Sequence, residues 1–145
     1  MSVTALARVK TRASITSTKF DAMLTQIIDG LTALFERQTN RTLVRAEGLV
    51  ALFDGGRAVV GPLTALPIEA IAEIKEDANP VDFTTVTALI DGTDFIANPD
   101  GGLITHLPRG VNWLAGIRNV RVTYTGGYVA AGITPQVNQA AMPED

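Results

Sequence analysis

Apolar residues in the first forty positions recur at the three- and four-residue spacing of amphipathic helices. Leu6, Val9 and Ala13 share one face of a short segment that Thr4 can cap, which predicts a helix over 4–12. A longer helix is predicted over 19–38, where one broad stripe collects Phe20, Leu24, Ile27, Ile28, Leu31, Leu34 and Phe35. Thr18 and Asp21 have the spacing of a capping box, and Asn40 suits a left-handed helix end.

From about residue 43 the period shortens to two, which indicates half-buried β-strands. In NVRVTY, residues 119–124, Val120, Val122 and Tyr124 alternate with Arg121 and Thr123, so one face is expected to be dry and the other wet. Two strands are predicted around the turn at 54–56. Further short strands are predicted in PIEAIAEIKE, TTVTALI, DFIA and GLITHL, separated by glycine- and aspartate-rich turns.

These elements together predict an α+β fold: an N-terminal helical pair over 4–40, followed by a short-stranded antiparallel β region over 43–128. Residues 1–128 are expected to form a single domain. Residues 129–145 are expected to form an extended C-terminal tail, or the start of a C-terminal helix at Pro143. The tail carries isolated apolar residues that suit anchors on another chain: Val129, Ile133, Val137 and Met142.

Composition and charge narrow the functional classes. The 145 residues are 46% hydrophobic and 19% charged, with a net charge of −3, which is typical of a globular domain and unlike a dedicated nucleic-acid binder. Absence of cysteine excludes disulfides and thiol chemistry. Neither a targeting segment nor a membrane helix is visible, so the chain is expected to be soluble, with no membrane partner.

The sequence offers little for catalysis. His106 is the only histidine and lies in GLITHLPRG, where no orienting partner stands nearby in the sequence, so a surface or hydrogen-bonded role is favoured. Asp91, Asp94 and Asp100 miss the spacing of a calcium loop and suit turns instead. We therefore expect no catalytic residues, no cofactor and no metal.

Two other features favour contacts with partners. Residues 1–41 carry six basic and three acidic residues, a balance of +3, to which Arg8, Lys10 and Arg12 contribute. A small helix-turn-helix-like DNA-binding or regulatory module is therefore an alternative, although the second helix is long and apolar-striped and lacks a polar recognition face at its start. Trp113 is expected either in the core or as an interface anchor.

The order of these parts resembles a known family. A short helix is followed by an apolar helix ending in RQTNRTL, then by FDGG, LPIEAIAEI, DFIANPDGGLITHLPRGVNW and the closing RVTYTGGY. Over about residues 4–143 this is similar to the head–tail connector, or adaptor, proteins of long-tailed bacteriophages and prophages.

The resemblance implies a virion structural protein without catalysis, located at the head–tail neck and assembled in the cytoplasm of the bacterial host. It implies a homo-oligomeric ring that contacts the portal protein and a downstream neck or tail-completion protein. Genomic DNA would pass through the ring, with only transient non-specific contact. Members of the family usually continue into a further helix after a segment like Pro143–Asp145, where this sequence stops.

Overall fold

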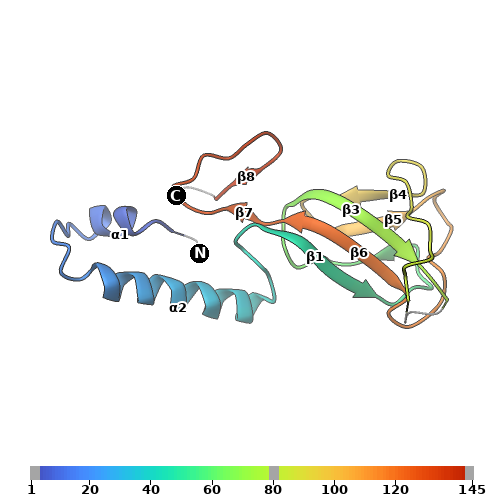
Figure 1. Cartoon of the computed structure of the whole chain (residues 1–145), viewed down its shortest axis with the longest axis horizontal. Coiled ribbons are helices and arrows are strands. Elements are labelled where there is room, and N and C mark those ends of the chain that lie inside the picture. Colours follow the sequence, from blue (N-terminus) through green and yellow to red (C-terminus); the bar gives the residue numbers. More distant parts are fainter. Residues whose placement is uncertain (1–3, 79–81, 143–145) are drawn as a thin grey trace.

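A helical arm and a β-sheet body make up the computed structural model, which describes residues 4–78 and 82–142 (Figure 1). The arm consists of α1 (Leu6–Arg12) and α2 (Asp21–Thr39), and the body follows from residue 46 onward. The predicted α+β class, with a helical pair before antiparallel sheets, is confirmed. The predicted continuation into a helix at 143–145 lies outside the described residues.

The ends of the helices differ in part from the prediction. Asn40 ends α2 in the left-handed conformation, with φ 52°, as expected. The predicted caps are wrong, because the N-cap residues are Ala5 and Phe20 and neither helix has a side-chain cap. Thr18 contributes only its backbone carbonyl, which accepts a hydrogen bond from the Asp21 N–H at 3.1 Å.

Two three-stranded antiparallel sheets form the body. The first has the order β1-β6-β3, with β1 at Ala46–Phe53, β6 at Val120–Gly126 and β3 at Ile68–Glu76. The second has the order β2-β5-β4, with β2 at Val59–Val60, β5 at Leu103–His106 and β4 at Phe95–Asn98. A short parallel pair, β7 (Tyr128–Val129) with β8 (Ala140–Ala141), forms the C-terminal tail. The predicted boundary after Tyr128 therefore falls within β7.

One prediction about the strands is confirmed and one is wrong. The two strands predicted around the turn at 54–56 are β1 and β2, although they lie in different sheets, because β1 pairs with β6 and β2 pairs with β5. The segment 84–90 is not a strand. Its backbone hydrogen bond to β3, from Leu89 N–H to the Ile74 carbonyl at 2.9 Å, is too little to make a ladder, and Ile90 bonds instead to the turn that follows it.

The core lies between the two sheets. Val120, Val122 and Tyr124 of β6 are buried on one face, as the alternating pattern predicted, and they pack with Ile74 and Ile104. The Tyr124 hydroxyl accepts hydrogen bonds from backbone N–H groups of residues 64 and 65 at 3.2 Å, so the ring carries a satisfied polar end into the core.

Trp113 belongs to this core. It is 1% exposed, and its ring meets that of His106 edge-to-face at 4.8 Å between centroids. Two hydrogen bonds of 2.9 Å fix its backbone. The Trp113 N–H donates to the Arg57 carbonyl, and the Gly56 N–H donates to the Trp113 carbonyl. The alternative in which Trp113 anchors an interface is therefore wrong, since its ring is not accessible to a partner.

Gly126→Ala is expected to destabilise the body by about 1–3 kcal/mol, the usual cost of overpacking. An added Cβ at this buried position of β6 would lie 2.3 Å from the Ala65 carbonyl oxygen and 3.0 Å from that of Pro67. Urea unfolding followed by Trp113 fluorescence measures the loss. Gly30→Ala on α2 is the matched control, because nothing lies within 4 Å of its added Cβ. An unchanged midpoint for Gly126→Ala would contradict the expectation.

The chain exposes more surface than a compact monomer of its size. Its accessible area is 9093 Å². A folded monomeric protein of 15.4 kDa is expected to expose about 7,200 Å². Because α2 projects away from the body (Figure 1), much of the helix surface has no other element against it.

Candidate functional site

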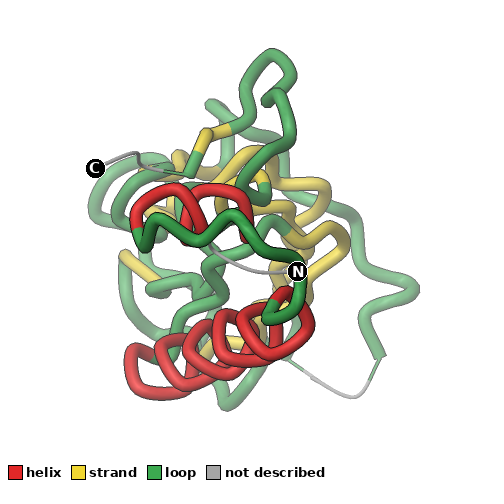
Figure 2. The backbone as a smooth tube through the Cα atoms, turned by 90° about the vertical axis from the view of Figure 1, so that its left-hand side faces the viewer, coloured by secondary structure: helices red, strands yellow, loops and turns green. Residues whose placement is uncertain are grey.

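An extended row of exposed apolar side chains runs along α2. Six residues, each between 42% and 63% exposed, form what we call the apolar stripe: Phe20, Met23, Ile27, Leu31, Leu34 and Phe35. The helix buries Ile28 and Thr32 on the adjoining side, where α1 packs above it in the view along the arm (Figure 2). The apolar pattern of α2 is therefore as predicted, but the stripe itself stays exposed. Each of these six side chains has about 200 Å² of surface, of which roughly half is exposed, so the stripe exposes on the order of 600 Å². This is at the upper end of the range for the largest apolar patch on a monomeric protein.

The three basic residues predicted as partner contacts, Arg8, Lys10 and Arg12, all lie on α1. Lys10 Nζ is used within the chain, in an ion pair with Asp21 Oδ1 at 2.6 Å that ties α1 to the start of α2. Arg12 is exposed and Arg8 is half-buried. The structure thus makes Lys10 an internal contact rather than part of a free basic face.

Four of the predicted contact residues meet in one groove. It has a volume of about 340 Å³, lies between the start of α1 and the tail, and its lining includes Arg8, Val129, Ile133 and Met142. Val129 is only 6% exposed, so its prediction as an anchor for a partner is corrected: it serves the chain's own packing. Ile133 and Val137 remain 58% and 89% exposed on the loop between β7 and β8, which projects where the arm joins the body (Figure 1).

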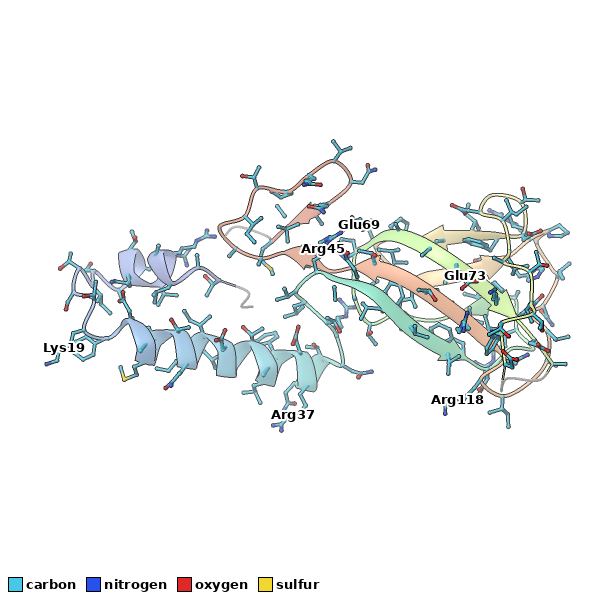
Figure 3. All side chains as sticks on the ribbon, in the orientation of Figure 1. Lys19, Arg37, Arg45, Glu69, Glu73 and Arg118 are labelled. Carbon is cyan, nitrogen blue, oxygen red and sulfur yellow. The ribbon has the colours of Figure 1, made fainter. Side chains whose placement is uncertain are left out.

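A charged cluster fixes the tail to the body. Arg45 donates through two nitrogens to the carboxylate of Glu69 and also contacts Glu47 at 2.6 Å (Figure 3). The hydrogen bond from Arg45 holds the pKa of Glu69 below its usual range, and the side chain of Gln139 in the tail acts in the same direction. The Arg45 N–H donates to the Tyr128 carbonyl at 2.7 Å, so the cluster joins the segment between the arm and β1 to the body and the tail.

The Arg45–Glu69 pair is expected to make stability depend on pH. Because the folded state lowers the pKa of Glu69, the unfolded chain takes up the proton first as the pH falls below about 4.3, and the stabilisation is lost in that range. Above about pH 5 the full contribution is present. Urea unfolding of the wild type and of Glu69→Gln from pH 7 to pH 3 measures it. The two curves should converge at low pH, and a constant difference would argue against the pair.

His106 has partners that the sequence did not reveal. Its Nε2 lies 3.6 Å from Glu76 Oε1, and its ring packs against Trp113. The second oxygen of Glu76 accepts a hydrogen bond from the Leu114 N–H at 2.8 Å, so this carboxylate joins β3 to the loop after β5. These contacts bind the two sheets together. Among the described residues, no group of three histidine, aspartate or glutamate side chains is arranged to hold a metal.

A second exposed apolar surface was missed in the sequence. Val59 and Ile96 both pair with Thr105, and Leu103 pairs with Asn98 of β4. The residues that alternate with them, Val60, Phe95 and Ile104, are buried, so Val59, Ile96 and Leu103 share the outer face of the β2-β5-β4 sheet, where they are 39–51% exposed. We call these three residues the outer patch. The sequence could not reveal the outer patch, because each of the three is an ordinary strand residue and only the register of the strands places them on one face.

Comparisons with family models, with curated proteins and with solved structures found no match for this chain. No helix within residues 4–78 and 82–142 has the length and apolar character needed to cross a bilayer.

Proposed function

We propose that this protein is a non-enzymatic structural component of a bacteriophage neck, which assembles as a homo-oligomeric ring between the portal and the next neck or tail-completion protein. DNA would pass through the ring, and the protein would be located in the virion after assembly in the host cytoplasm. The proposal begins from the order of sequence segments, which is similar to that of head–tail adaptors.

The observation that carries the proposal is the uncovered apolar stripe. Monomeric soluble proteins seldom leave a contiguous apolar surface of this size open to water, and larger patches mark interaction surfaces. The accessible area of 9093 Å² exceeds that of a compact monomer, as expected of a chain that completes its packing in an assembly. An arm that projects from the β-sheet body is also a suitable shape for contact with neighbouring subunits.

The alternative DNA-binding module has less support. A recognition helix needs polar or basic side chains toward the groove, whereas the start of α2 exposes Phe20, Met23 and Ile27. Lys10, one of the basic residues that suggested it, is paired with Asp21. The net charge of −3 favours only weak, non-specific contact with duplex DNA.

Native mass spectrometry and negative-stain images of the protein, alone and with its cognate portal, test the proposal. A closed ring with an open centre that seats on the portal supports it. A monomer or dimer that does not bind the portal, but binds duplex DNA with strong salt dependence, would favour the DNA-binding alternative.

A further inference from the structure

The apolar stripe has a basic residue near each end. Lys19 lies in the turn just before α2, where its Nζ is 5.8 Å from the centroid of the Phe20 ring of the stripe. Arg37 lies in the last turn of α2, three residues after Leu34 of the stripe, so these two side chains are neighbours on the helix surface. Figure 3 shows Lys19 on the loop that precedes α2 and Arg37 on the side of α2 that faces away from α1.

The outer patch has acidic surroundings. Asp91 and Asp94 lie in the turn before β4, and Asp100 lies in the turn after it. Asp94 accepts a hydrogen bond from the Ile90 N–H at 2.8 Å, which fixes this turn. Ile90, which precedes the turn, and Ile96 on β4 are both exposed, so acidic turns and exposed apolar side chains alternate along this part of the chain.

The charges of the arm and the body follow the same division. Residues 1–41 carry six basic and three acidic residues, which gives +3, whereas residues 42–128 carry six basic and ten acidic residues, which gives −4. The arm of one copy and the body of another are therefore complementary in charge. Two arms, or two bodies, would repel each other.

We propose that the apolar stripe of one copy packs on the outer patch of a second copy, with Lys19 and Arg37 facing the aspartates around β4. This contact would join neighbouring subunits of the ring, so the inference rests on the proposed function. A head-to-tail contact joins two different surfaces and therefore continues from copy to copy until the rotation closes the ring. The stripe, on the order of 600 Å², supplies most of the roughly 800 Å² per partner of a standard interface.

A complementation experiment tests the contact. The stripe variant carries Ile27→Glu with Leu31→Glu, and the patch variant carries Ile96→Glu with Leu103→Glu. The control is Val50→Glu, an equally exposed apolar position on β1 outside both surfaces. Sedimentation of each protein follows confirmation by thermal melting that it is folded.

Wild type and Val50→Glu should associate. Each double variant alone should be monomeric, with self-association weakened by about 100-fold or more. An equimolar mixture of the two double variants should form a 1:1 dimer and nothing larger, because only one of the two possible contacts is intact.

Three results would overturn the inference: dimers of the patch variant alone, which would mean that two stripes pair with each other; a mixture that stays monomeric; or wild type that is monomeric at every concentration. Normal rings on the portal from both variants would also overturn it while leaving the proposed function standing. A 1:1 mixed dimer from a protein whose wild type never forms rings with the portal would support the contact and refute the adaptor.

Discussion

Trp113→Ala is expected to lower the free energy of unfolding by about 3–5 kcal/mol, the usual cost of removing a large buried aromatic side chain. The indole is 1% exposed and lies in the core between the sheets, with its neighbours Ile104 and Val120 also fully buried. The backbone of residue 113 is fixed by two hydrogen bonds, so the loop cannot easily collapse into the cavity. Since domains are stable by only about 5–15 kcal/mol, this one change removes a large share.

Urea unfolding followed by circular dichroism measures the loss, because the variant has no tryptophan fluorescence. Ile117→Ala, four residues away and 75% exposed, is the control, and its effect should stay within about 0.5 kcal/mol. A loss below about 1 kcal/mol for Trp113→Ala would mean that the indole is not part of a packed core.

The elements that the sequence predicted well are those whose pattern reflects their own burial. β6 is the central strand of its sheet, and every second side chain along it faces the core. Val120, Val122 and Tyr124 therefore show a clean period of two. The helical period of α2 is equally clear over five turns. Both elements were found within two residues of their observed ends.

Strand pairing was not predictable in the same way. The glycine-rich turn at 54–56 indicates a local reversal, and a hairpin is the simplest reading of it. In the structure Gly55 instead donates its N–H to Asn119 Oδ1 at 2.9 Å, which brings the turn to the start of β6. Asn119 is fully buried and also donates to the Leu114 carbonyl at 2.6 Å. A local sequence pattern cannot reveal a contact between two residues that are sixty-four positions apart.

The sequence predicted the candidate surfaces only in part, for a related reason. Periodicity showed that α2 is apolar on one side, but a pattern cannot tell whether that side meets the chain's own core or another molecule. The same applied to Trp113 and Val129, which the sequence offered as contacts and the fold buries. Ile133 and Val137 are both exposed to solvent, and their role as anchors on another chain stays a prediction.

These two side chains lie on a loop that the chain holds in place. β7 pairs with β8 at its base, and the Gln136 N–H donates to Gln139 Oε1 at 3.0 Å. A held loop loses less conformational entropy on binding than a free tail, so its exposed apolar groups can contribute more to affinity. The described part of the tail, residues 129–142, has no charged residue to desolvate in a contact.

Under the proposed function, Ile133→Ser with Val137→Ser is expected to weaken binding to the portal by about 100-fold, because two anchors at about 1–2 kcal/mol each are lost. Thermal stability should not change, since both side chains are exposed at 58% and 89%. Surface plasmon resonance with immobilised portal measures the affinity. Val50→Ser controls for the loss of any exposed apolar group. Val129→Ser should instead lower the melting temperature, because this side chain is buried. Unchanged portal binding by the double variant, with Val129→Ser destabilised as expected, would show that the loop is ordered by the chain without serving as its docking surface.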